Sequence, residues 1–254
     1  MKLFGLLAGS LLVAGAQLHS PAWASDAADV KQILSNIPVF VPTTSDGKIQ
    51  QVKRQVEKKS VDVVFAAMSP AAASLLVDQI IRPAKGKSAS DITLRVMPIT
   101  QFRESFAAIK AEATGRVEMA YVPDPIQEGP AISLMTSQGV KRDVAVNIAR
   151  SQPIFFCPEP LVTVTQKVAN QDRTFSPCGQ DYLQMSLLVL GSNIKESRPG
   201  LQAVPLAALE ESLLSQPADK IKSVLLLPTA ATEQAIQNSS KGNAGDSRGS
   251  GRKK

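Results

Sequence analysis

The sequence predicts an α+β fold in which one strand-and-helix unit occurs twice, with an antiparallel-rich sheet and helices packed on it. The first observation is an internal repeat: Val96-Met97-Pro98-Ile99 recurs as Ala203-Val204-Pro205-Leu206, and both copies continue into similar residues. In each copy the apolar residues before the proline indicate the end of a strand, and apolar residues four apart indicate a helix after it. This repeat predicts a pseudo-symmetric domain with clefts between or on its halves.

The second observation is the order of apolar patterns in the first half. A serine followed by a proline is a favourable helix start, because serine caps the first turn and proline already has a helical φ. An Asp-Gly pair between apolar runs is a hairpin signal. In order, we expect a helix capped by Ser25, a strand over 39–41, a hairpin turn at Asp46-Gly47, a return strand over 48–56, a central strand over 61–67, a helix from Ser69-Pro70, a strand over 92–96 and a helix from Thr100.

The second half is expected to repeat this order with one departure, because β-branched residues stand where a helix would come. The strand over 153–156 is taken as the counterpart of the central strand near Phe65. In order, we expect a strand over 117–122, a break at Pro123-Asp124-Pro125, a second hairpin of 131–135 and 140–148 around Ser137-Gln138-Gly139, the strand 153–156, a β-rich segment 161–165, a strand over 185–190, a helix over 206–214, a strand over 221–227 and a helix from Thr229 to Ile236.

The N-terminus is typical of a secretion signal over residues 1–24. Lys2 precedes an apolar run over 3–15, and Ala22-Trp23-Ala24 has the small-x-small pattern of a cleavage site. Cleavage after Ala24 would remove His19, the only histidine of the chain.

The C-terminus over 239–254 is predicted to be a disordered basic tail, because it contains almost no apolar residues. Of the formal net charge of +6, this tail carries +4 and Lys2 carries +1, so residues 25–238 carry only +1. The basic composition therefore does not indicate nucleic-acid binding, although the tail could make peripheral contact with an anionic membrane. Residues 25–238 are expected to form a single domain, with halves at about 25–116 and 117–238.

The residue inventory argues against an enzyme. Without its histidine the mature chain lacks Ser-His and Cys-His pairs and most zinc ligand sets. No glycine-rich phosphate-binding motif is present. Asp124 and Glu159 each stand between prolines and are interpreted as turn formers. We therefore expect no catalytic residue, no metal and no cofactor.

The only two cysteines are Cys157 and Cys178. In an exported chain two cysteines favour a disulfide, which would contribute about 3 kcal/mol in the chain-entropy model. The alternative is a buried Cys157 at the end of a core strand and a free Cys178 in a loop.

Large apolar side chains in three strands are the remaining candidates for a binding site. The ordinary interpretation is a hydrophobic core. The other is that some of them line apolar clefts for unfolded or extended polypeptide. The candidate residues are Val39, Phe40, Val64, Phe65, Ile154, Phe155 and Phe156.

The order of several short motifs resembles a known family. These motifs are Ile37-Pro38-Val39-Phe40, Val63-Val64-Phe65, Val96-Met97-Pro98-Ile99, Tyr121-Val122-Pro123-Asp124-Pro125 and Gln152-Pro153-Ile154-Phe155-Phe156. Together they resemble the twenty-two-kilodalton component of the translocon at the inner chloroplast envelope and its cyanobacterial relatives, over most of residues 30–236. The chain departs from the family after Phe156, where Pro158-Glu159-Pro160 replaces a polar, helix-forming segment.

The resemblance implies a periplasmic, chaperone-like protein that assists polypeptide transport and outer-membrane biogenesis, without cofactor or catalysis. Its implied partners are unfolded or precursor polypeptides and outer-membrane assembly or translocation machinery, and the thylakoid lumen is the alternative compartment. Two other classes stay open: a scaffolding envelope protein that acts through its basic tail, and a small-molecule binder, which would need convergent polar groups in a cleft.

Overall fold

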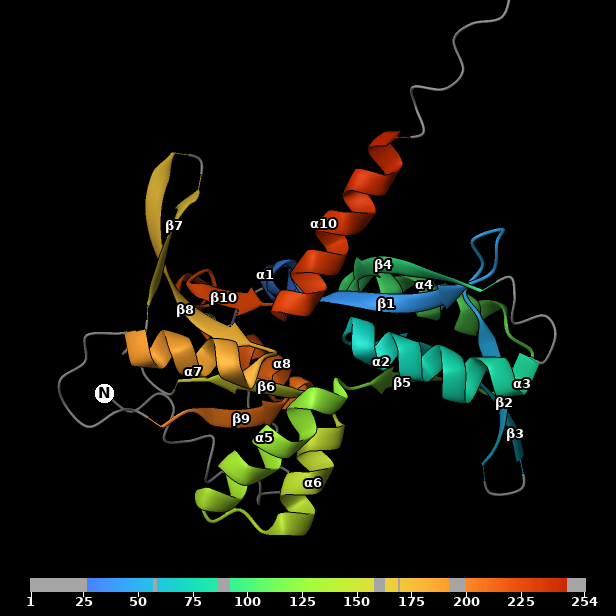
Figure 1. Cartoon of the computed structure of the whole chain (residues 1–254), viewed down its shortest axis with the longest axis horizontal. Coiled ribbons are helices and arrows are strands. Elements are labelled where there is room, and N and C mark those ends of the chain that lie inside the picture. The colour runs from blue at the N-terminus through green and yellow to red at the C-terminus, as the bar shows by residue number, and fades with distance from the viewer. Residues whose placement is uncertain are drawn as a thin grey trace, which may run out of the picture.

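The structure is a computed structural model that describes residues 27–56, 59–85, 92–157, 163–168, 170–191 and 200–245. The predicted signal segment 1–24 and Pro158-Glu159-Pro160 lie outside these ranges. The described residues form two five-stranded sheets with helices on both sides, so the predicted α+β class is confirmed (Figure 1).

The first sheet contains strands from the first half of the chain. Its order is β2-β3-β1-β4, and β5 pairs in parallel with β3. The other pairs are antiparallel. The strands are β1 (Pro38–Thr43), β2 (Gln51–Val56), β3 (Lys59–Ala67), β4 (Thr93–Pro98) and β5 (Val117–Val122).

The second sheet repeats this arrangement. Strand β8 pairs in parallel with β10 and antiparallel with β6 and β7, and β6 pairs with β9. The strands are β6 (Pro153–Phe156), β7 (Val164–Val168), β8 (Gln171–Gly179), β9 (Gln202–Pro205) and β10 (Val224–Leu227).

Eleven helical segments accompany the sheets in the described ranges. They are α1 (Ala27–Leu34), α2 (Pro70–Leu75), the π-helix η1 (Leu76–Ile81), α3 (Arg82–Lys85), α4 (Ile99–Glu112), α5 (Pro125–Ser137), α6 (Arg142–Arg150), α7 (Tyr182–Gly191), α8 (Leu206–Leu214), α9 (Ala218–Ile221) and α10 (Ala230–Gly245).

Register and hydrogen bonds show that the two halves are built alike. Pro38 lies opposite Pro98 in the first sheet, and Pro153 lies opposite Pro205 in the second. The helix after each second proline begins with an equivalent bond: Ile99 N donates to the Ile37 carbonyl at 2.8 Å, and Leu206 N donates to the Gln152 carbonyl at 3.0 Å. The repeat read from the sequence is therefore a repeat of topology.

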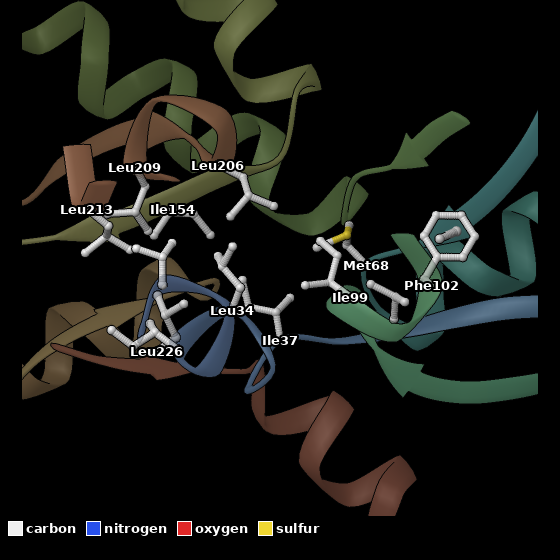
Figure 2. Packing of buried hydrophobic residues seen from close by; sticks show 14 of the residues in the cluster. Leu34, Ile37, Met68, Ile99, Phe102, Ile154, Leu206, Leu209, Leu213 and Leu226 are labelled. Atoms are coloured by element: carbon white, nitrogen blue, oxygen red, sulfur yellow. The ribbon is translucent and has the colours of Figure 1, made fainter. Parts of the chain in front are cut away.

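The halves share one hydrophobic core. Strand neighbours point to opposite faces of a sheet, and one face of each sheet packs on a common layer formed by α1, α4 and α8. Figure 2 shows this cluster, which extends from Phe102 of the first half past Leu34 to Ile154 and Leu226 of the second half. The opposite face is covered by α2 and η1 in the first sheet and by α5, α6 and α7 in the second.

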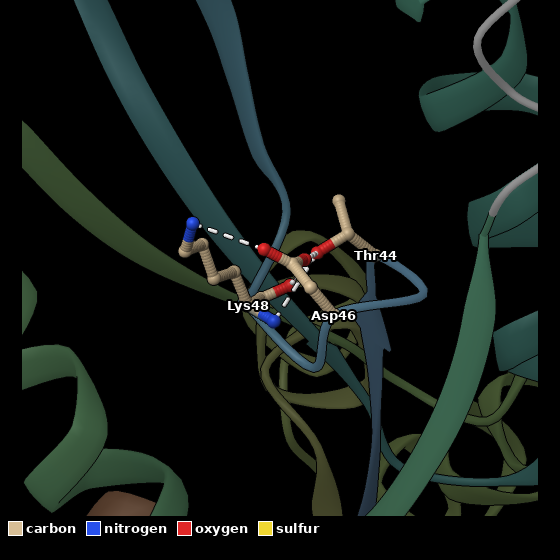
Figure 3. Close-up of polar contacts among 3 residues, drawn as sticks. All are labelled: Thr44, Asp46 and Lys48. Atoms are coloured by element: carbon tan, nitrogen blue, oxygen red, sulfur yellow. Dashed lines mark hydrogen bonds and ion pairs between the residues drawn. The ribbon is translucent and has the colours of Figure 1, made fainter.

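The predicted Asp46-Gly47 turn forms, but not as a hairpin of two paired strands. Gly47 has a φ of +82°, and the Lys48 ammonium lies 2.9 Å from the Asp46 carboxylate, which also accepts a hydrogen bond from Thr44 (Figure 3). The Thr44 bond and then the Lys48 contacts lower the pKa of Asp46 to about 2. Beyond the turn a single bridge pairs Ile49 with Thr43 of β1, and from Gln51 onward the return strand β2 pairs with β3 and not with β1.

Two other predicted strand assignments are wrong. The expected second hairpin over 131–148 is the helix pair α5 and α6. Gly139, read as a hairpin turn, has a φ of +84° and ends α5, where Val140 N donates to the Met135 carbonyl at 3.0 Å. The strand expected over 185–190 is helix α7. Short apolar runs do not distinguish a strand from a helix.

The halves also differ from the prediction in detail. Strand β6 pairs with β9 as β1 pairs with β4, so its counterpart is β1 and not the central strand that contains Phe65. The predicted boundary after residue 116 separates β5 from the first sheet, whereas β5 pairs with β3 along its whole length.

Helix α10 extends into the predicted tail. It continues to Gly245 and so includes residues 239–245. Adding a residue to an existing helix costs far less than starting a helix, which explains how a polar segment can continue one. Residues 246–254 lie outside the described ranges.

Candidate functional site

The structure buries all seven residues predicted to line polypeptide-binding clefts. Each has at most 4% of its surface exposed; the residues are Val39, Phe40, Val64, Phe65, Ile154, Phe155 and Phe156. Because both faces of each sheet are covered, neighbouring side chains of one strand enter two different cores. Phe155 packs with α7 while Phe156 packs in the shared core. The ordinary interpretation of these residues is confirmed, and their prediction as a binding surface is wrong.

The predicted disulfide between Cys157 and Cys178 does not form in the structure. The register gives the reason: Cys178 lies opposite Phe156, and side chains one residue apart face opposite sides of a sheet. Cys178 joins the shared core, where burial raises the pKa of its thiol to about 12.

Exposed apolar side chains gather instead on helix α7. Leu183, Leu187 and Leu190 have 65%, 59% and 57% of their surface exposed. Their spacing of four and then three residues places them in one stripe along the helix. Most other exposed large apolar side chains in the described ranges reach only 37–43%.

The opposite side of α7 explains why this segment is helical. Met185 is fully buried, and Leu188 and Val189 pack on the same cluster. Gly179 lets the helix approach the sheet, because a Cβ at this position would lie 2.7 Å from Cγ of Met185. The side chain of Asp181 caps the helix by accepting a hydrogen bond from Gln184 N at 3.0 Å. The ten residues of α7 include no charged side chain.

The start of α5 adjoins the start of α7 and carries a further exposed apolar side chain. The side-chain oxygen of Gln127, which is 4% exposed, accepts a hydrogen bond from Tyr182 N at 2.9 Å. The next residue back, Ile126, is 65% exposed. We refer to Ile126, Leu183, Leu187 and Leu190 as the α7 face.

Asp124, interpreted from the sequence as a turn former, is the N-cap of α5. Its carboxylate accepts a hydrogen bond from Ile126 N at 3.0 Å, and Pro125 occupies the first helical position. Burial raises the pKa of Asp124, and the nearby Asp181 carboxylate acts in the same direction. Asp124 thus has a structural role at the junction of α5 and α7.

A concave surface lies between α1, α4 and α8. It is an open groove of about 390 Å³, with an apolar floor that includes Val30, Leu34 and Ala107. The groove is bordered by ion pairs between Lys31 and Glu104 and between Arg103 and Glu210, the latter at 2.8 Å. Because its charges are already paired within the chain, the groove offers no free cation or anion among the residues that line it.

The Arg103–Glu210 pair joins the two halves at equivalent positions. The two residues stand at the same place in the internal repeat, five positions after Pro98 and Pro205. Burial lowers the pKa of Arg103, but hydrogen bonds to Glu210 and to the Tyr121 hydroxyl outweigh it and hold the pKa above its usual value. Identical charges at these equivalent positions would repel across the contact between the two halves, whereas this pair of opposite charges attracts.

Replacing Glu210 with glutamine tests this pair. We expect Glu210→Gln to lower the free energy of unfolding by about 1 kcal/mol, the upper end for exposed ion pairs, because both side chains remain more than a quarter exposed. Urea denaturation of this variant and of Glu211→Gln, at the exposed neighbouring position, measures the difference. Equal stabilities would show that the pair contributes nothing.

The described residues contain neither a metal-binding group nor a candidate membrane span. No three His, Cys, Asp or Glu side chains come together there in a way that would hold a metal ion. No helix in these ranges has both the length and the apolar character that crossing a bilayer requires.

Sequence reasoning missed the α7 face because it assigned residues 185–190 to a strand. A signal was present, since the leucines at 183, 187 and 190 have helical spacing. A continuous apolar run around them conceals this period.

Comparison with known proteins shows which solved structures have a similar fold. The sequence matches no protein-family model and no curated protein. The structure is similar to Anabaena Tic22, described as a protein of protein transport, with a TM-score of 0.67 and 17% identity over 84% of this chain and 97% of that chain. It is also similar to Tic22 from Plasmodium falciparum, with a TM-score of 0.58 and 12% identity over 84% and 98% of the two chains. The resemblance predicted from the order of motifs is confirmed at the level of structure, and the chain has the fold of Tic22.

Proposed function

We propose that this chain is a non-enzymatic, chaperone-like protein that binds unfolded or precursor polypeptides during protein transport and outer-membrane biogenesis. The α7 face is the proposed contact surface. The transport role rests on the fold shared with Anabaena Tic22, which is described as a protein of protein transport.

The observation that carries the proposal is the exposure of the α7 face. A helix that belongs only to a core turns polar residues to solvent, whereas α7 turns three leucines outward and has no charged residue. Leaving such side chains in water is unfavourable, and large exposed apolar patches are typical of sites for protein or membrane contact.

Binding at this face would depend on apolar contact. Fully burying one leucine is worth about 1.5–3 kcal/mol, and part of that gain offsets the ordering of both partners. A few leucines therefore fit weak, reversible binding, as a carrier that must release its cargo requires. Because α7 lacks charge, affinity should depend little on salt.

The proposed compartment is the periplasm, and the thylakoid lumen is the alternative. Support comes from the N-terminal pattern of Lys2, an apolar run and Ala22-Trp23-Ala24. The proposed partners are precursor polypeptides and the assembly or translocation machinery that receives them.

The variant Leu183→Gln/Leu187→Gln/Leu190→Gln tests the function. Glutamine retains helix propensity, so we expect stability within about 0.5 kcal/mol of wild type, as for other surface substitutions. The full chain should suppress aggregation of a chemically denatured client, and the triple variant should lose most of that activity. Light scattering measures the suppression. Leu94→Gln is the matched control, because Leu94 is exposed in β4, outside the α7 face.

Two outcomes would contradict the proposal. A triple variant as active as wild type would exclude the α7 face. Loss of activity only on deletion of residues 239–254 would favour the scaffolding alternative, in which the C-terminal segment recruits a membrane or another envelope protein.

A further inference from the structure

Helix α7 has a structural counterpart in the first half of the chain, helix α2. Met68 N donates to the Val122 carbonyl at 3.0 Å before α2, and Gln180 N donates to the Leu227 carbonyl at 3.1 Å before α7. The next residue caps each helix through its side chain: Ser69 accepts from Ala72 N at 3.2 Å, as Asp181 accepts from Gln184 N. These bonds fix which residues of the two helices are equivalent.

The equivalent positions have different side chains. Counting from the caps, Leu183 corresponds to Ala71 and Leu187 to Leu75. Leu75 is 38% exposed, against 59% for Leu187. The position three further on holds Leu190 in α7 and Asp78 in the first half. Asp78 forms an ion pair with Arg82 at 2.5 Å, so charge replaces the end of the apolar stripe.

The fourth member of the α7 face has a counterpart as well. Helices α5 and α10 follow the parallel strands β5 and β10 through the related segments Val122-Pro123-Asp124 and Leu227-Pro228-Thr229. Ile126 stands two residues after its cap, and Ala231 stands two residues after Thr229, which accepts from Thr232 N at 3.1 Å. Alanine again replaces a large apolar side chain.

The helix of the first half also changes geometry. From Leu76 to Ile81 the chain forms the π-helix η1, whereas α7 remains an α-helix to Gly191. A π-helical turn contains an extra residue and shifts the direction of later side chains. The first half therefore presents no continuous apolar stripe beyond Leu75.

We infer that the chain has a single polypeptide site, on the second half only, and that it takes an uncharged apolar segment. This inference rests on the proposed function and adds the number of binding sites and the kind of segment that they bind. The lack of charged residues in α7 indicates which kind of segment binds there. A charged group buried against the leucines of α7 would meet no oppositely charged side chain of that helix and would lose its hydration, which is strongly unfavourable. Leucine at three positions of α7 gives such a segment an apolar surface that Ala71, Leu75 and Asp78 do not provide.

Titration with a defined peptide tests the inference. The probe is a fluorescein-labelled synthetic peptide of about 16 residues, long enough for four helical turns. It has leucines at a spacing of four and three, with glutamine, serine and alanine elsewhere. Its control replaces the leucines with serine. We compare the full chain with two variants altered at equivalent positions, Leu183→Gln/Leu187→Gln and Ala71→Gln/Leu75→Gln.

We expect one peptide per chain by isothermal titration calorimetry. The α7 variant should raise the dissociation constant at least about tenfold, a change that corresponds to about 1.4 kcal/mol. For the α2 variant, Ala71→Gln/Leu75→Gln, the dissociation constant should stay within about twofold of the wild-type value. Urea denaturation of both variants verifies that they are folded.

The results separate the inference from the proposed function. Two peptides per chain, or equal weakening by both variants, would overturn the single-site inference while leaving polypeptide binding intact. No binding of the leucine peptide by the wild-type chain would overturn both. Equal binding of the serine control would show that apolar contact is not the basis of recognition.

Discussion

Replacing Phe155 with alanine should lower the free energy of unfolding by about 3–5 kcal/mol, the range for removing a buried phenylalanine from a core. Phe155 is fully buried, and its ring packs edge-on against Tyr182 with centroids 5.6 Å apart. The substitution would leave a cavity under the start of α7, between the helix and strand β6. It should therefore also loosen the helix that carries the α7 face.

Urea denaturation monitored by circular dichroism measures this effect. The matched control is Phe175→Ala, because Phe175 is only partly buried in the β7–β8 pair. We expect the control to cost clearly less than Phe155→Ala. If Phe155→Ala proved as stable as wild type while losing client binding, Phe155 would belong to a binding surface after all, and its burial as described would be incorrect.

The duplicated architecture could be predicted from the sequence because its signal is local. A proline that ends a strand and begins a helix constrains the backbone whatever surrounds it. Pro98 and Pro205 do this in both halves, with apolar residues at helical spacing after them. The register that sets Pro38 opposite Pro98 and Pro153 opposite Pro205 depends on distant segments, and no local pattern specifies it.

The errors of assignment arose where tertiary packing decides the structure. Residues 185–190 are apolar at almost every position, so a buried strand and a helix on a sheet are equally consistent with them. The structure selects the helix because Met185 fits over Gly179 and Asp181 caps the first turn. Only the fold brings these three residues together.

The binding residues were mispredicted for a related reason. A phenylalanine in a strand indicates that some element covers it, but not which one. Here helices cover the outer face of each sheet, so Phe40, Phe65 and Phe155 are core. The exposed apolar side chains lie one layer further out, on helix α7, which covers the second sheet. A sequence pattern gives the periodicity of an apolar face and leaves its partner undetermined.

Comparison of the two halves also identifies a position where the second half buries a polar side chain in place of an apolar one. Met68 follows β3 and is fully buried in the shared core, whereas its counterpart Gln180 follows β8 and is 2% exposed. Neither polar atom of the Gln180 side chain has a hydrogen-bond partner among the described residues. Burial without a partner makes such an amide costly, at about 1–3 kcal/mol on the scale of protein mutations.

Replacing Gln180 with methionine should therefore raise the free energy of unfolding by about 1–3 kcal/mol. Methionine has nearly the length of glutamine and occurs at the equivalent position of the first half, so the site can accommodate it. Gln127→Met is the matched control: Gln127 is also buried, but its side-chain oxygen accepts the Tyr182 N hydrogen bond, so this substitution should lower stability. Urea denaturation of both variants measures the two changes in the free energy of unfolding, which should have opposite signs. If Gln180→Met lowered stability instead, the Gln180 amide would have a favourable partner in solution, and a polar role at the base of α7 would have to replace the argument from symmetry.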